Sequence, residues 1–125
     1  MISIISVKSN TTMTALDTSS LIAKAADDKK ASQILVMDMR KLTTSTDYFI
    51  VCSGGSAIQT RAIADNIIEQ LDIAGRQFLH REGYKSGEWI LLDYGDCVAH
   101  IFTAESREFY GLENLWGDAH VTHYE

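Results

Sequence analysis

Short apolar runs alternate along this chain with longer segments whose apolar residues have helical spacing. The runs at 34–39 (ILVMDM) and 48–54 (YFIVCSG) are rich in β-favouring residues and are bounded by polar clusters, which predicts strands rather than helices. The runs at 77–82, 89–94 and 97–102 have the same character. Because the run at 48–54 is almost wholly apolar, we expect it near the centre of the sheet.

Two segments before residue 76 carry the spacing of amphipathic helices. Residues 17–31 begin with an Asp/Thr/Ser cluster that can cap a helix. One stripe of that helix is apolar: Leu21, Ile22, Ala25 and Ala26. A longer helix is predicted after Ser56, because Gln59 three residues on completes a capping-box pattern, and Gly75 is placed to end it.

The C-terminal part predicts a third helix that begins near Thr103 and places Phe109, Leu112 and Trp116 on one face. Together these elements predict one α/β domain with a mixed five-stranded sheet and helices mainly on one face. The 125 residues suffice for one core. The predicted parts are a flexible tail at 1–16, a domain at 17–119 and a C-terminal tail at 120–125.

Gly95-Asp96 stands between two strand-type runs and has the form of a two-residue hairpin turn. In such a hairpin, opposed residues share a sheet face and side chains alternate with period two. One face is then apolar and suited to lie under helices: Ile90, Leu92, Tyr94, Cys97, Ala99 and Ile101. The other face mixes aromatic, apolar and ionisable groups: Trp89, Leu91, Asp93, Val98, His100 and Phe102.

Spacing alone leaves two interpretations of the mixed face open. As an open face it is a protein-binding surface, because aromatic anchors are enriched at interfaces. Trp89→Glu is then expected to abolish binding and leave the fold intact. As a covered face it would lie under a helix. His100 would then be a core histidine whose hydrogen-bond partner is Asp93, diagonally across the hairpin. An open patch of Trp89, Leu91 and Phe102 also favours a weak homodimer.

The charge balance limits the classes of partner. Acidic residues outnumber basic ones by 17 to 11, and the net charge is −6. A nucleic-acid-binding domain usually gathers Lys and Arg on one face, so no direct DNA binding and little direct RNA contact are expected. An acidic surface suits a basic protein partner. No apolar run approaches the ~20 residues that span a bilayer, so no membrane partner is expected.

Candidate catalytic chemistry is sparse. Gly54-Gly55-Ser56 before a helix can hold a phosphate on backbone N–H groups, which leaves a nucleotide-binding or nucleotidyltransferase-type enzyme as the alternative function. Such an enzyme needs paired acids on a neighbouring strand for divalent metal, and the aspartates here are scattered. The four histidines form no ligand cluster by spacing. Cys52 and Cys97 lie in apolar runs, as core thiols of a cytoplasmic protein do. No catalytic residue, metal site or cofactor is expected.

Three segments, DYFIVCSGGSAIQTRAIADNI, GEWILLDYGDCVAHIF and REFYGLENLWGDA, resemble the ribosomal silencing factor (Iojap-like) family in order and spacing. The resemblance covers about residues 17–119. It implies a nucleotidyltransferase-like fold without catalytic residues, and binding to the large ribosomal subunit through its protein fourteen. It also implies that the bound protein blocks subunit joining and represses translation under nutrient limitation. Finally, it favours the open-face interpretation, with a binding patch centred on Trp89, Leu91 and His100.

Overall fold

The computed structural model describes residues 13–124 of the chain. The predicted α/β class is confirmed. In chain order the elements are α2 (Ala15–Asp28), β1 (Ser32–Asp38), β2 (Tyr48–Gly54), α3 (Ala57–Ile73), β3 (His80–Glu82), β4 (Trp89–Asp93), β5 (Cys97–Thr103), α4 (Ala104–Tyr110), α5 (Leu112–Leu115) and β6 (His120–His123).

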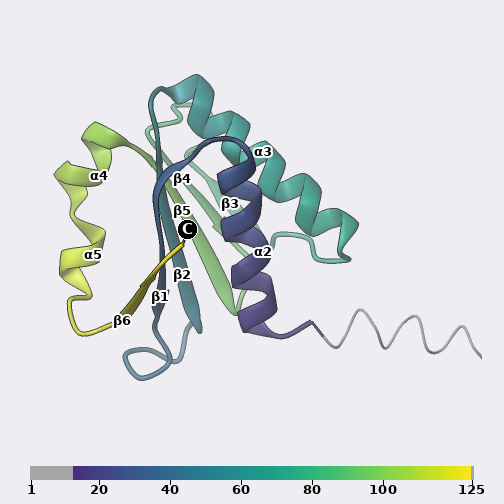
Figure 1. Ribbon diagram of the computed structural model, residues 1–125, viewed down its shortest axis with the longest axis vertical. Coiled ribbons are helices and arrows are strands. Elements are labelled where there is room, and N and C mark those ends of the chain that lie inside the picture. The colour runs from purple at the N-terminus through teal and green to yellow at the C-terminus, as the bar shows by residue number, and fades with distance from the viewer. Residues whose placement is uncertain (1–12, 125) are drawn as a thin grey trace, which may run out of the picture.

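The strands form one mixed, six-stranded sheet in the order β3-β4-β5-β2-β1-β6 (Figure 1). β2 pairs in parallel with β5 and antiparallel with β1, so its predicted central place is confirmed. The sheet has one strand more than predicted, because residues 120–123, expected as a tail, pair with β1. This polar segment becomes a strand because the edge of β1 offers unpaired backbone N–H and C=O groups.

α2 begins before the predicted helix, so Ala15 and Leu16 belong to it and not to a tail. Thr14 is the N-cap: its hydroxyl accepts the Asp17 N–H at 3.0 Å, and the Asp17 carboxylate accepts the Thr14 N–H at 3.2 Å. This reciprocal pair satisfies two backbone donors that the first turn leaves free. The predicted apolar stripe lies against the sheet, with Ile22 fully buried.

α3 begins and ends where the sequence indicates. The Ser56 hydroxyl accepts the Gln59 N–H at 3.1 Å, whereas the Gln59 side chain accepts the N–H of Gly55 rather than that of Ser56. Beyond the last turn Gly75 has a φ of +90°, in the left-handed region that closes many helices.

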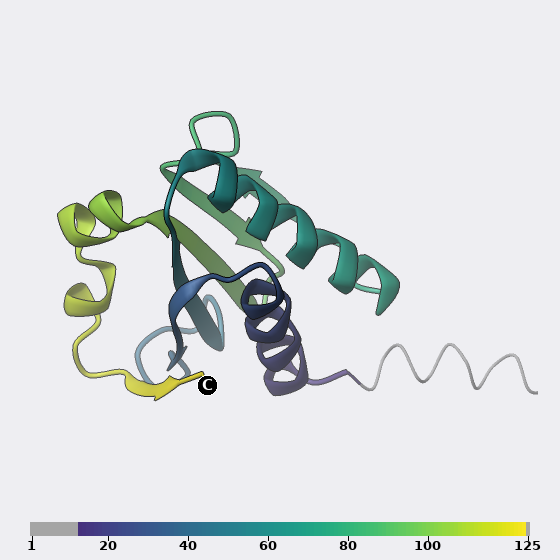
Figure 2. The same ribbon diagram turned by 45° about the horizontal axis from the view of Figure 1, so that its top comes forward.

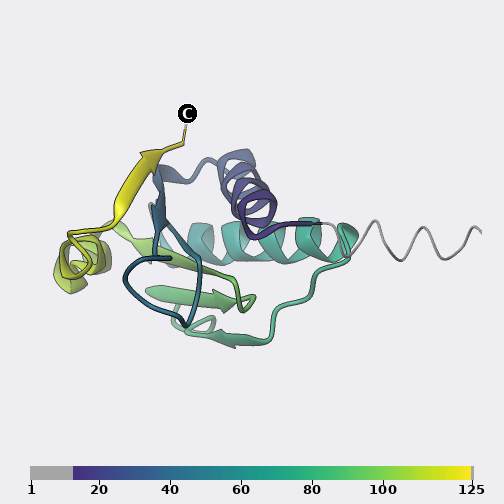
Figure 3. The same ribbon diagram turned by 90° about the horizontal axis from the view of Figure 1, so that it is seen from below.

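Both faces of the sheet carry a core, and the two cores differ in size. α2 and α3 pack against each other and cover one face (Figure 2), while α4 and α5 lie on the opposite side (Figures 1 and 3). The larger core lies under α2 and α3. The smaller core, on the opposite side, consists of five buried residues: Met37, Met39, Val51, Phe102 and Leu112.

The C-terminal helix is broken, in contrast to the single helix predicted. Gly111 has a φ of +57° and separates α4 from α5. Leu112 is buried and Trp116 half-buried, as the predicted face requires, but Phe109 is 80% exposed. The turn at Gly111 changes the helix direction, so the regular spacing of these three side chains no longer places them on one face.

A buried arginine fastens α4 to the sheet. Arg107 donates to the backbone oxygen of Gln33 at 2.8 Å and to the hydroxyl of Ser53 at 2.9 Å, and it pairs with the Glu113 carboxylate at 3.1 Å. Its guanidinium therefore joins α4 and the start of α5 to β1 and β2. A buried arginine is stable only when its donors are satisfied in this way.

Candidate partner-binding face

The hairpin has the register that its turn predicts. Trp89 pairs with Phe102, Leu91 with His100, and Asp93 with Val98. Gly95 has a φ of +89°, and the Asp93 carboxylate accepts the Gly95 N–H at 2.7 Å. These contacts fix which side chains share a face, because a shift of one residue would exchange the two faces.

The face predicted to lie under helices does so. All six of its residues are buried members of the larger core: Ile90, Leu92, Tyr94, Cys97, Ala99 and Ile101. Burial raises the pKa of the Cys52 thiol to about 12, and burial also raises the pKa of Cys97 far above its usual range. Both thiols therefore stay protonated at neutral pH and act as small apolar groups.

The mixed face is partly covered, so neither sequence interpretation is complete. Phe102 is 0% exposed and His100 4% exposed, and Val98 is also buried. Trp89, Leu91 and Asp93 are half-buried. The expectation of an uncovered face is wrong for Phe102, because the α5 segment packs over it to form the smaller core.

His100 is a buried histidine whose hydrogen bond differs from the predicted one. Its Nδ1 accepts the indole N–H of Trp89 at 3.1 Å, while Asp93 is engaged with the turn. Burial lowers the pKa of His100 to about 4, so the ring is neutral at pH 7. Since Nδ1 is an acceptor, the proton lies on Nε2, which is buried without a hydrogen-bond partner.

A hollow of about 450 Å³ opens on the mixed face and gathers four of the six predicted site residues. These four are Leu91, Asp93, Val98 and His100. Trp89 lies outside the hollow, where its ring stacks on Phe102 at 4.9 Å between centroids. Trp89 also packs on Tyr110 of α4 at 4.8 Å between centroids.

Sequence reasoning missed several residues of this face. Phe49 meets the His100 ring edge-on at 4.6 Å, and Trp116 lies over Phe49 at 6.3 Å. Tyr110 packs on Trp89 at 4.8 Å. Phe49 was recoverable in principle, because β2 is a central strand and Phe49 alternates with its helix-facing residues. The other two lie in the C-terminal segment, and hairpin spacing does not reveal that this segment packs on the mixed face.

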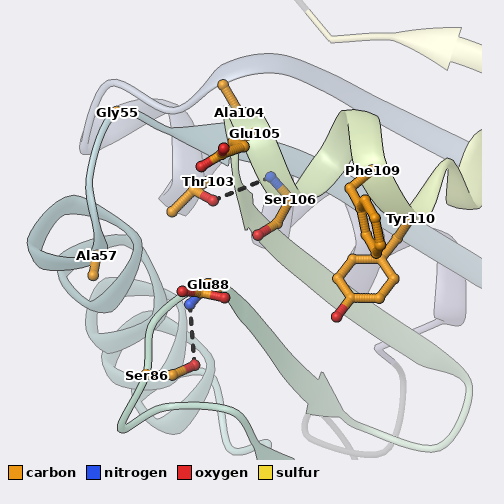
Figure 4. Close-up of a pocket in the computed structure, with 10 residues that line it drawn as sticks. All are labelled: Gly55, Ala57, Ser86, Glu88, Thr103, Ala104, Glu105, Ser106, Phe109 and Tyr110. Carbon is orange, nitrogen blue, oxygen red and sulfur yellow. Dashed lines mark hydrogen bonds between the residues drawn. The ribbon is translucent and has the colours of Figure 1, made fainter.

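The strand-to-helix turn at Gly54–Ser56 borders a second hollow, of about 710 Å³. Its two charged lining residues are Glu88 and Glu105 (Figure 4). Carboxylates repel phosphate, so these walls do not favour a nucleotide that carries no metal ion. Within residues 13–124, no three His, Cys, Asp or Glu side chains are grouped to hold a metal ion. Nor does this part of the chain contain a helix long and apolar enough to cross a bilayer.

Residues 13–124 form a small α/β domain whose candidate site is one face of a β-hairpin rich in aromatic side chains. The chain belongs to the ribosomal silencing factor family: the family model described as "Ribosomal silencing factor during starvation" matches residues 12–125. The predicted family is thereby confirmed.

Individual relatives agree with this assignment. The chain is 44% identical over 99 residues to "Ribosomal silencing factor RsfS" of Bacillus subtilis, covering 79% of this chain and 84% of that protein. It is 39% identical over 100 residues to chloroplastic "Protein Iojap" of Zea mays, covering 78% of this chain and 42% of that longer protein. A crystal structure of a Chromobacterium violaceum protein superposes with a TM-score of 0.82 at 37% identity, covering 84% of this chain and 88% of that one. The likeness to nucleotidyltransferases stays a prediction.

Proposed function

We propose that this protein binds the large ribosomal subunit through protein fourteen, using the mixed face of the hairpin. The bound domain occupies space that the small subunit needs, so subunits do not join and translation falls under nutrient limitation. The observation that carries the proposal is the family match over residues 12–125. A mouse relative, 30% identical over 91 residues, is named for mitochondrial assembly of the ribosomal large subunit.

The geometry of the mixed face supports this use. Trp89 and Leu91 are half-buried on β4, with the 450 Å³ hollow beside them. Leu91 pairs with both β3 and β5, and Trp89 pairs with β5, so little conformational entropy is lost when a partner binds. Large aromatic side chains on such a rigid base are typical binding anchors.

The charge of the chain supports a protein contact. A net charge of −6 favours encounter with a basic ribosomal protein and disfavours direct contact with RNA phosphates. The cytoplasm, where ribosomes assemble and initiate, is the proposed location. We also propose a weak homodimer through Trp89 and Leu91, on a patch smaller than predicted because Phe102 is buried.

Co-sedimentation with separated ribosomal subunits tests the proposal. We expect the protein to pellet with large but not small subunits, and added protein to lower the light-scattering signal of subunit association. Leu91→Glu should abolish both effects. Ile73→Glu is the matched control, because Ile73 is 74% exposed on α3, on the other side of the sheet. A protein that stays in the supernatant, or that pellets without affecting subunit joining, contradicts the proposal.

A further inference from the structure

The second hollow lies next to the proposed binding face and has a distinct chemistry. Its walls come from the turn at 55–57, the loop that leads into β4, and α4 (Figure 4). Figure 4 shows the carboxylates of Glu88 and Glu105 on one side and the rings of Phe109 and Tyr110 on the other. All four side chains are exposed to solvent.

The two rings are exposed although the smaller core lies close by. Phe109 is 80% exposed and Tyr110 52% exposed. Leu112, beyond the break at Gly111, is the residue of this segment that is buried in the smaller core. The rings pack edge-on at 5.0 Å, and Tyr110 packs on Trp89 at 4.8 Å. The exposed aromatic surface is therefore continuous with the hairpin face, and such patches on small proteins usually mark interaction sites.

The hollow suits a cation. The face of an aromatic ring attracts positive charge, and the facing carboxylates add to that attraction. Within residues 13–124 neither Glu88 nor Glu105 takes part in an ion pair. The nearby hydroxyls have local roles: that of Thr103 accepts the Ser106 N–H at 3.3 Å, and that of Ser86 accepts the Glu88 N–H at 3.3 Å. The two carboxylates are therefore the charged acceptors that the hollow offers to a partner.

We propose that this hollow binds a basic side chain of a ribosomal protein while the hairpin face is bound, an inference that rests on the proposed function. Arginine fits best, because its planar guanidinium stacks on a ring and donates to carboxylates at once. Such a contact makes α4 a second part of the interface. It also explains why the charged groups beside the exposed rings are both acidic.

Large-subunit affinity measured over a salt series tests the inference. Glu88→Gln combined with Glu105→Gln should lower affinity about tenfold at low salt and flatten its salt dependence, because two charge contacts are lost. Asp27→Asn with Glu69→Gln is the matched control, since it removes the same charge from exposed positions on α2 and α3. Phe109→Ser should weaken binding about three- to tenfold and leave the melting temperature unchanged.

Each outcome distinguishes this inference from the proposed function. If Glu88→Gln/Glu105→Gln binds as tightly as its control, the inference is wrong and the proposed function stands. Tighter binding also overturns it, because it would mean that this surface faces RNA phosphates. A photoreactive benzoylphenylalanine at position 109 should crosslink to a ribosomal protein, and crosslinks to RNA alone would contradict the inference. If the wild-type protein does not pellet with the large subunit, both proposals fail.

Discussion

Trp89→Glu separates the stabilising contribution of this side chain from its contribution to binding. A fully buried Trp covers roughly 150–250 Å², so half burial at about 25 cal/mol per Å² contributes about 2–3 kcal/mol. The substitution also removes the N–H that His100 accepts at 3.1 Å, and a buried acceptor without a donor costs about 1–3 kcal/mol. We therefore expect the free energy of unfolding to fall by about 3–6 kcal/mol, rather than the unchanged stability that an open face predicts.

A loss of this size leaves a typical domain folded but less stable, since native proteins have about 5–15 kcal/mol in all. The melting temperature should fall by about 15–30 °C. For binding, loss of an aromatic anchor costs at least about 2 kcal/mol, or about thirtyfold in affinity. Circular dichroism melts give the first quantity, and co-sedimentation at about 10 °C, where the variant is folded, gives the second.

Two further variants make this prediction refutable. Trp89→Phe keeps an aromatic ring on Phe102 and loses the N–H together with part of the ring area, so it should be about 1–3 kcal/mol less stable and bind within about fivefold of wild type. Ile73→Glu should change neither quantity. A folded Trp89→Glu protein that still pellets with the large subunit refutes Trp89 as an anchor. A variant with unchanged stability refutes the packing described for Trp89.

Four other predictions follow from the contacts described. Nucleotides with Mg²⁺ or Mn²⁺ should not raise the melting temperature, because within residues 13–124 no three His, Cys, Asp or Glu side chains are grouped to hold the metal ion; a rise of several degrees would support the enzyme alternative. The pKa of His100 falls from 6.5 to about 4 on folding, so as pH falls the unfolded chain is protonated at His100 before the folded protein is. Up to about 3 kcal/mol of stability is therefore lost as pH falls through that range. His100→Gln should flatten this part of the pH profile measured by urea unfolding, and an unchanged profile would contradict the assignment. Arg107→Met should cost about 3–5 kcal/mol, because the Gln33 carbonyl, the Ser53 hydroxyl and the Glu113 carboxylate all lose their donor, and hydrogen exchange should be fastest in α4 and α5; a loss below 1 kcal/mol would contradict this. Light scattering at about 100 µM should show dimers, fewer with Leu91→Glu, and a strict monomer would exclude the homodimer.

The hairpin was predictable in detail because its determinants are local. Gly95 supplies the positive φ that a tight turn needs, and period two then assigns each side chain to a face. What lies on each face depends on distant segments. His100 has two diagonal neighbours, Trp89 and Asp93, which spacing cannot rank. Asp93 accepts the Gly95 N–H in the turn, and Trp89 is the neighbour that hydrogen-bonds to His100.

The C-terminal segment was the least predictable part for the same reason. Regular spacing from Phe109 to Trp116 indicates one helix, but the left-handed Gly111 interrupts it and leaves Leu112 over the smaller core. Residues 120–123 carry no strand pattern of their own, and only the edge of β1 makes them a strand. The strand at 120–123 depends on tertiary contacts, which override local preference.

The two parts of the proposed binding surface, on β4 and on α4, are not held equally firmly. Trp89 and Leu91 lie on β4 and pair with β5, whereas Phe109 and Tyr110 lie on α4, which has seven residues and is too short to be stable alone. The position of α4 depends on Arg107, whose guanidinium reaches β1 and β2. Arg107 is 7% exposed, so it offers a partner almost no surface. Its loss should nevertheless weaken large-subunit binding, because binding would then have to order α4 as well as contact it. By the same linkage, a partner that holds α4 in place should slow hydrogen exchange there more than in the hairpin.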